Sequence, residues 1–223
     1  MSYSHQWRNG EAVDYPPGKI VCVGRNYAEH ARELGNEIPK EPVLFIKPAT
    51  AFMHVSKGIN LPQRNESYHY ELEIALLIGK NTANLNGSPI LSSVTGMGLG
   101  LDLTLRTTQS RLKAAGHPWE RAKAFDGSCP ITPFTPIDEL NGDWQHVFSL
   151  SINGELRQQG EPRDMLFGFA ALLDEIQHSF TLLPGDVVLT GTPKGVGEIA
   201  HGDQLTLQLG AHMSYTSTVS IVD

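Results

Sequence analysis

Short runs of β-branched and apolar residues recur along the chain, each bounded by Gly, Pro, Asn or Asp. Runs of this length between turn-forming residues predict β-strands. The strands predicted in this way are 19–23, 43–46, 71–78, 148–152, 186–190, 204–209 and 215–221. The pattern therefore favours a mainly β protein.

Helical periodicity is confined to a few segments. The clearest helix is predicted at 164–178, where apolar residues recur at helical spacing behind Asp164 as the N-cap. Shorter helices are predicted at 27–34 and 106–115. Because strands and helices do not alternate regularly, a doubly wound parallel sheet is not expected. The predicted fold class is mixed and mainly β, with a few peripheral helices.

The length of 223 residues matches one ordinary domain with a buried core. We expect residues 18–223 to form this single domain and residues 1–17 to form an N-terminal extension. Residues 127–141 are rich in Pro, Thr and Gly, which predicts a long loop. No internal repeat or low-complexity linker indicates a second domain.

Composition and charge exclude several classes of protein. With 40% hydrophobic and 18% charged residues, the chain is typical of a soluble globular protein, and no apolar run approaches the roughly 20 residues of a membrane span. The first residues lack the apolar stretch of a secretory signal, so a cytoplasmic protein is expected. A net charge of −7 without basic clusters argues against nucleic acid or an anionic membrane as a partner. The two cysteines, Cys22 and Cys129, lack the paired spacing of a zinc or redox motif.

Two carboxylates interrupt a predicted strand. Glu71 and Glu73 lie two positions apart in the apolar segment 71–78, which places both side chains on one face. Two ionised carboxylates on a buried face repel each other unless a cation lies between them. Asp102, in another apolar segment, would complete an oxygen-only site suited to Mg²⁺, Mn²⁺ or Ca²⁺ rather than zinc. The alternatives are an edge strand with its glutamates in water, and Asp102 as the cap of a helix that starts near residue 104.

His30 and Glu33 stand three positions apart on the predicted helix 27–34, so their side chains share a face. A carboxylate bonded to an imidazole fixes its tautomer and raises its basicity, as a water-activating general base requires. A surface His–Glu contact is the alternative. Lys123 lies between apolar neighbours, where it could neutralise an enolate or a substrate carboxylate. The alternative is a surface lysine whose stem lies along apolar groups.

A glycine-rich segment at 190–197 follows a predicted strand. It does not have the Walker spacing of a phosphate-binding loop, and no helical pattern follows it. Its hydroxyls and free amides could bind a carboxylate at the mouth of a site. A tight β-turn with glycines at positive φ is a compatible reading.

Together these segments resemble the fumarylacetoacetate hydrolase family, and in particular its short single-domain acylpyruvases. The resemblance extends from about Lys19 to Leu207. It rests on motifs that occur in one order: GRNY at 24–27 with His30 and Glu33, FIKP at 45–48, His69 with ELE at 71–73, Asp102 with Arg106 and Gln109, KAFD at 123–126, and PGD at 184–186 with TGTPKGVG at 190–197. One departure is Thr107, where the family commonly has an acidic residue.

The resemblance implies a β-roll or β-sandwich fold of the type of that family's C-terminal domain, with residues 18–223 as the catalytic domain and usually a homodimer. It implies that Glu71, Glu73 and Asp102 hold Mg²⁺ or Mn²⁺, with Ca²⁺ possible in crystals. His30 with Glu33 is implied to activate water, and Lys123 to polarise the substrate. The implied substrate contacts are Arg25, Tyr27, Arg106, Gln109 and Thr192.

The activity implied is metal-dependent cleavage of a carbon–carbon bond in an acylpyruvate, a 2,4-dioxo acid, which releases pyruvate and a carboxylic acid. A metal-bound 2-oxo acid such as oxaloacetate can also lose CO₂ or tautomerise through the same enolate, so an oxaloacetate decarboxylase, a tautomerase or a 2-oxo acid isomerase is the alternative. A catalytically silent metal-binding β module is an alternative from another class. The presence of both His30 and Lys123 argues against it.

Overall fold

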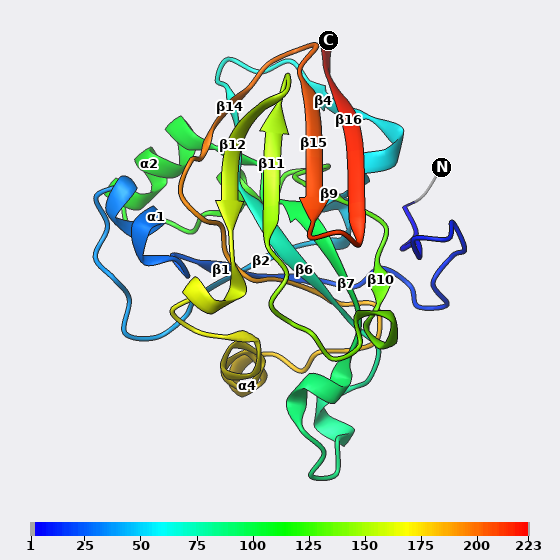
Figure 1. Ribbon diagram of the computed structural model, residues 1–223. Helices are drawn as coiled ribbons and strands as arrows, with labels where there is room; N and C mark the ends of the chain where they lie inside the picture. Colours follow the sequence, from blue (N-terminus) through cyan, green and yellow to red (C-terminus); the bar gives the residue numbers. More distant parts are fainter. Residues whose placement is uncertain (1–2, 223) are drawn as a thin grey trace.

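Two β-sheets pack against each other in the computed structural model, which describes residues 3–222 (Figure 1). The larger sheet has the strand order β2 (Val43–Lys47), β1 (Ile20–Gly24), β13 (Val187–Leu189), β6 (Leu72–Ile78), β7 (Val94–Leu101), β9 (Cys129–Ile131), β3 (Phe52–His54), with β10 (Thr135–Pro136) also paired to β7. The five-stranded sheet has the order β12 (Glu155–Gly160), β11 (Phe148–Ile152), β15 (Gln204–Leu209), β16 (Met213–Val222), β4 (Ile59–Pro62). A small third sheet consists of β14 (Gly197–Ile199), β5 (Tyr68–Tyr70) and β8 (Thr104–Leu105).

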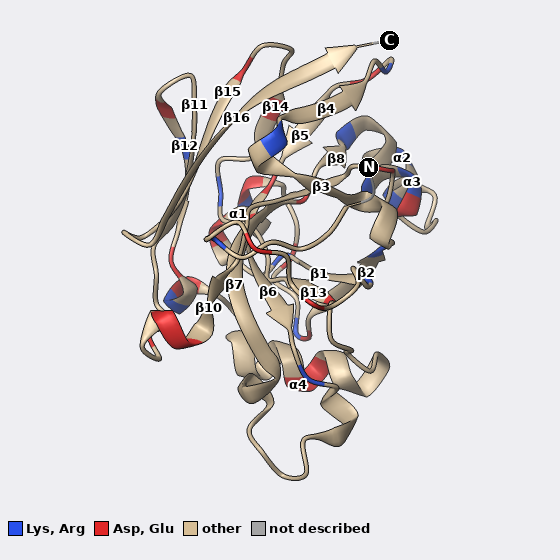
Figure 2. Ribbon diagram, turned by 90° about the vertical axis from the view of Figure 1, so that its right-hand side faces the viewer, with Lys and Arg blue, Asp and Glu red and all other residues tan. Residues whose placement is uncertain are grey.

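The helices lie at the periphery. They are α1 (Ala28–Glu33), α2 (Arg106–Ala114), α3 (Glu120–Lys123) and α4 (Phe169–Ser179). Short 3₁₀ turns occur at Ala49–Ala51, Val55–Lys57, Thr82–Asn84, Ile90–Ser93, Ile137–Leu140 and Pro162–Asp164. Figure 2 shows α2 and α3 on the side of the molecule away from β11, β12, β15 and β16, with α4 below the sheets. The mixed, mainly β fold predicted from the sequence is confirmed, and within residues 3–222 no helix is long and apolar enough to cross a membrane.

Strand β6 shows why the sequence around the two glutamates is so apolar. All seven of its residues are buried. Ile74 and Leu76 pack into the core between the sheets, whereas Ala75 and Leu77 pack into a second core on the opposite face. A strand covered on both faces is hydrophobic throughout instead of alternating.

The N-terminal segment covers the second core. Tyr3 and Trp7 pack against this core, and Trp7 forms a bridge with Phe134. His5 is fully buried, and its Nε2 lies 2.9 Å from the Gly185 carbonyl oxygen. Residues 3–17 therefore shield the larger sheet from water. The division of the chain into an N-terminal extension, 1–17, and a single domain, 18–223, stays a prediction.

Two predicted segments differ in the structure. The helix predicted at 164–178 begins at Phe169, with Gly168 as its N-cap. The residues before it cannot join the helix because their N–H groups bind Asn26: Leu166 donates to the Asn26 carbonyl, and Phe167 donates to Asn26 Oδ1. Asp164 lies instead in the 3₁₀ turn before them. The loop predicted at 127–141 contains β9 and β10, because buried side chains there complete the sheet beside β3 and β7.

Candidate active site

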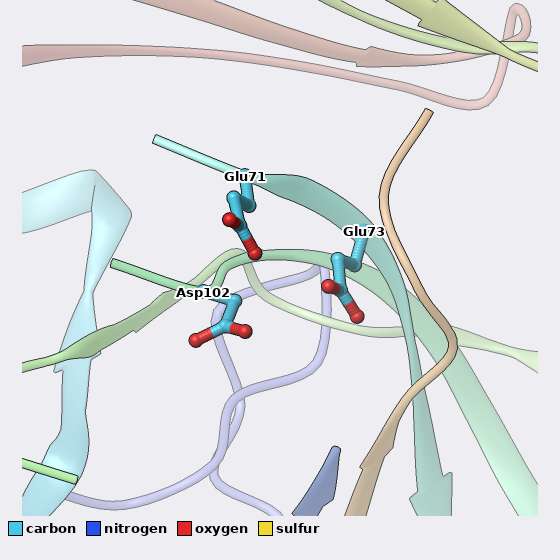
Figure 3. A group of neighbouring side chains, drawn as sticks. All are labelled: Glu71, Glu73 and Asp102. Atoms are coloured by element: carbon cyan, nitrogen blue, oxygen red, sulfur yellow. The ribbon is translucent and has the colours of Figure 1, made fainter. Parts of the chain in front are cut away.

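The strands that carry the predicted metal ligands pair along one continuous ladder. β6 pairs with β7, and β5 pairs with β8 in the same register, so Glu71 lies directly opposite Asp102 where the chain passes from the large sheet into the small one. The Asp102 N–H donates to the Glu71 carbonyl at 2.8 Å. Side chains directly opposite each other share a face, and Glu73 follows two positions later on that same face. Figure 3 shows the three carboxyl groups lying beside one another.

This triad, Glu71, Glu73 and Asp102, has the properties of a metal site. One oxygen from each carboxylate lies within 4.8 Å of the other two, and all three residues are buried. Burial, together with the Asp102 and Glu71 carboxylates, raises the pKa of Glu73 well above its usual value. Such repulsion is relieved by a cation, and a donor set made only of carboxylate oxygens suits Mg²⁺, Mn²⁺ or Ca²⁺. The residues present therefore fit a divalent metal ion.

Both alternatives for these carboxylates are wrong. Glu71 and Glu73 are only 5% and 2% exposed, so they do not lie in water on an edge strand. Asp102 does not cap the following helix, because the N-cap of α2 is Leu105 and the Asp102 carboxylate lies beside those of Glu71 and Glu73. The triad is thus buried although none of its members is apolar.

Cationic side chains border the triad. Lys123 Nζ donates to Glu71 Oε2 at 2.7 Å and to Asp102 Oδ2 at 2.6 Å, and Arg106 donates to Glu71 Oε1. Burial opposes ionisation of Glu71, but the Lys123 and Arg106 charges outweigh it and hold the pKa of Glu71 far below its usual value. Burial of Lys123 is outweighed in turn by Asp102 and Glu71, which raise the pKa of Lys123. Lys123 is therefore a fixed ammonium at neutral pH, and not a surface lysine.

Lys47 is a site residue that the sequence did not identify. It is fully buried at the end of β2, and its Nζ lies 2.8 Å from Asp102 Oδ1. The same ammonium donates to the carbonyls of Lys123 and Ser128, the second at 3.1 Å. Lys47 therefore fixes Asp102 and the turn that carries Lys123. A lysine within the apolar FIKP motif was the available signal, since a buried lysine requires anionic or carbonyl partners.

The predicted His–Glu pair forms on α1. His30 is buried, and its Nδ1 lies 3.2 Å from Glu33 Oε2. The other Glu33 oxygen accepts the Gly195 N–H at 3.0 Å. When Nδ1 carries the proton shared with Glu33, Nε2 of the neutral imidazole is the proton acceptor.

The segment 191–195 connects this pair with the triad. Besides Gly195, which binds Glu33, the Gly191 N–H donates to Glu73 Oε2 at 2.7 Å. Gln158 holds the segment in place: its amide nitrogen donates to Thr192 Oγ1 and to the Pro193 carbonyl, both at 2.9 Å. The Gln158 carbonyl oxygen accepts the N–H of Leu72, between the two glutamates, at 2.8 Å. One loop therefore contacts both the metal ligands and the histidine pair.

A single cavity brings most of the predicted site residues together. Its lining includes the triad, His30, Lys123, Arg25, Arg106, Gln109 and Thr192, with Phe45 and Trp119 as apolar members. Glu33 is not among the residues that line the cavity, but it contacts His30, which is. Tyr27 does not line this cavity: its hydroxyl donates to the Glu161 carbonyl at 3.3 Å, and its side chain faces a neighbouring hollow. Thr107, the departure from the family pattern, is exposed and leaves the triad intact.

Known proteins are similar to this chain over most of its length. The model of the fumarylacetoacetate (FAA) hydrolase C-terminal domain matches residues 19–220. The chain is 47% identical over 213 residues to an oxaloacetate tautomerase of Escherichia coli, covering 95% of this chain and 97% of that protein. It is 40% identical over 193 residues to a mitochondrial oxaloacetate tautomerase of Bos taurus, covering 86% of each.

A solved structure agrees with these matches. The crystal structure of a fumarylpyruvate hydrolase from Pseudomonas aeruginosa in complex with Mn²⁺ and pyruvate is 33% identical, with a TM-score of 0.90 over 99% of this chain and 96% of that one. Its bound Mn²⁺ is consistent with a divalent metal at the buried triad described above. The chain therefore belongs to the fumarylacetoacetate hydrolase family and is an enzyme of that family.

Proposed function

We propose that this enzyme is a divalent-metal-dependent oxaloacetate tautomerase, which interconverts the keto and enol forms of oxaloacetate. The observation that carries the proposal is that a proton acceptor, His30, and a fixed ammonium, Lys123, line one cavity with the carboxylate triad. A proton acceptor beside a stabilised negative charge is what enolisation next to a carbonyl requires. The names of the E. coli and bovine relatives support oxaloacetate as the substrate.

Glu71, Glu73 and Asp102 would hold the metal ion. When bound, it acts as a Lewis acid that draws electron density from the 2-oxo group and so acidifies the neighbouring C3 protons. His30 Nε2 removes one C3 proton. The electron pair of the broken C–H bond forms the C2–C3 double bond, and the π pair of the carbonyl moves to the 2-oxo oxygen. Glu33 stabilises the imidazolium that forms, and Lys123 stabilises the charge on oxygen without losing its own proton. Protonation of this oxygen, by the imidazolium or by water, completes the enol.

The test compares two histidines that have the same kind of partner. In both His30 and the exposed His178, the Nδ1 atom contacts the carboxylate of a glutamate three positions away. His30→Ala should lower the rate of tautomerisation by about 10²- to 10⁴-fold, the usual contribution of a general base, whereas His178→Ala should leave it unchanged. Tautomerisation is followed by the ultraviolet absorbance of the enol in the presence of Mg²⁺ or Mn²⁺. Equal rates for both variants would contradict the assignment of His30.

Hydrolysis of acylpyruvates is a second candidate function, favoured by the similarity to the fumarylpyruvate hydrolase that binds Mn²⁺ and pyruvate. In that reaction His30 would take a proton from water instead of from carbon, and the leaving group would again be an enolate. Pyruvate release from acetylpyruvate measures it, and release of pyruvate and CO₂ from oxaloacetate measures the decarboxylase alternative. A homodimer and a cytoplasmic location, expected from the sequence, are further parts of the proposal.

A further inference from the structure

One face of helix α2 lines the cavity. Arg106, Gln109 and Lys113 stand at positions i, i+3 and i+7, which coincide in direction on a helix, and all three line the cavity. Arg106 contacts Glu71 and donates to Gln109 Oε1 at 2.7 Å. Since each helical residue rises about 1.5 Å, Lys113 begins roughly 10 Å further along the axis than Arg106. Lys113 therefore lines a part of the cavity beyond the triad.

Two of the cations in this part of the cavity, Arg25 and Lys113, have no ion-pair partner among residues 3–222. The ion pairs within residues 3–222 include Lys123 and Arg106, both against the triad, but neither Arg25 nor Lys113. Lys113 Nζ donates instead to a neutral acceptor, Asn36 Oδ1, at 2.9 Å, and Asn36 also lines the cavity. A lysine held in place by an uncharged partner keeps its whole charge for a ligand.

Two further observations concern Lys113 and Arg25. Burial, followed by the charges of Arg25 and Arg106, lowers the pKa of Lys113, so the three groups repel one another. Arg25 adopts a φ of +59°, a left-handed conformation that residues with a Cβ rarely take. Strained backbone of this kind is found where the surrounding structure positions a side chain for binding.

We propose that Arg25, Arg106 and Lys113 bind the second carboxylate of a 2-oxo dicarboxylate whose 2-oxo acid group lies at the triad, and that Lys113 determines this specificity. The inference rests on the proposed function and names the feature of the substrate that the cavity selects. A 2-oxo acid with a neutral tail leaves the three cations repelling one another. A dianion such as oxaloacetate supplies the missing charge, and charge complementarity of this kind discriminates among ligands.

Binding of two ligands of equal chain length tests the inference. Oxaloacetate and 2-oxobutanoate share the 2-oxo acid group and differ in having a carboxylate or a methyl group at C4. Isothermal titration calorimetry with Mg²⁺ present measures the affinity of each for the wild type, Lys113→Met, Lys113→Arg and the control Arg111→Met. Arg111 lies on the same helix but does not line this cavity.

Lys113→Met should weaken oxaloacetate binding about fivefold, as expected for an ion pair at a partly exposed site, and change 2-oxobutanoate binding less than twofold. Lys113→Arg should restore most of the oxaloacetate affinity, and Arg111→Met should change neither ligand. Equal weakening of both ligands, or unchanged oxaloacetate affinity, overturns the inference. A wild-type enzyme that binds oxaloacetate by this pattern but does not tautomerise it would refute the proposed function and leave the inference standing.

Discussion

Gln158 offers a direct test of how the site is held together. Its side chain is 1% exposed and makes three hydrogen bonds, to the N–H of Leu72, to Thr192 Oγ1 and to the carbonyl of Pro193. Gln158→Met keeps the length of the side chain and removes its amide. The buried Leu72 N–H then loses its partner, and the Pro193 carbonyl keeps only the weak bond from the Thr192 hydroxyl, 3.5 Å away.

The expected loss of stability follows from these two groups. Each buried polar group left without a partner costs about 1–3 kcal/mol, and the Thr192 hydroxyl offsets part of this, so the free energy of unfolding should fall by about 2–5 kcal/mol. This is less than the typical 5–15 kcal/mol of a folded protein, so the variant should still fold. The loop would no longer be fixed to the strand of Glu71 and Glu73, and a displacement of about 1 Å at a catalytic group lowers the rate by about 10²-fold.

Urea unfolding and oxaloacetate turnover measure the two effects on the same preparation. The matched control is Gln159→Met, because Gln159 is the next residue on β12 and is exposed. A stability loss below about 1 kcal/mol would refute the hydrogen-bond reasoning. A large stability loss with wild-type turnover would show that the loop does not position the catalytic groups.

Other perturbations give distinct expected results. Since the pKa of Glu73 is raised, the metal-free protein should lose stability as the pH rises above the ordinary carboxyl pKa of 4.5. The gain in melting temperature on adding Mg²⁺ should therefore grow with pH, and a gain that does not depend on pH would contradict this. Glu33→Gln should lower turnover less than His30→Ala does, because the imidazole remains but loses its orienting anion; the ratio of the two kcat values checks it. Lys123→Met should depress tautomerisation and decarboxylation of oxaloacetate together, since both pass through an enolate, and a loss of one alone would count against its assigned role. Light scattering should give the mass of a homodimer at micromolar concentration, and a monomer mass would refute that expectation.

Local patterns in the sequence were enough to predict that Glu71 and Glu73 share one face of a strand, but not that Asp102 joins them. Glu71 and Glu73 interrupt a run that is otherwise apolar, and period-2 geometry places both on one face. The position of Asp102 opposite Glu71 depends on strand pairing between distant segments, which the sequence does not display. The helices 27–34 and 106–115 were predicted within one or two residues, because each has a clear helical pattern that ends near a glycine.

Strand β7 was missed because its sequence, VTGMGLGL, contains three glycines and lacks the β-branched pattern of a strand. The structure explains one of them: a Cβ on Gly100 would lie 2.7 Å from the side-chain ends of both Ile131 and Leu189, so a larger residue would force these buried side chains to move. Strand β12 was missed because Leu156 is its only large apolar residue. A register shift in its pairing with β11 points Gln158 inward while Leu156 is exposed, and simple alternation cannot predict such a bulge.

The most direct test of the proposed function compares two reactions of the wild-type enzyme. The value of kcat/KM is measured with Mg²⁺ for tautomerisation of oxaloacetate and for release of pyruvate from acetylpyruvate, each before and after removal of the metal by a chelator. We expect tautomerisation to be faster by at least about tenfold, a difference of about 1.4 kcal/mol in barrier height, and to be lost with the chelator and recovered when Mg²⁺ is returned. Metal-dependent cleavage of acetylpyruvate without acceleration of oxaloacetate tautomerisation would contradict the account.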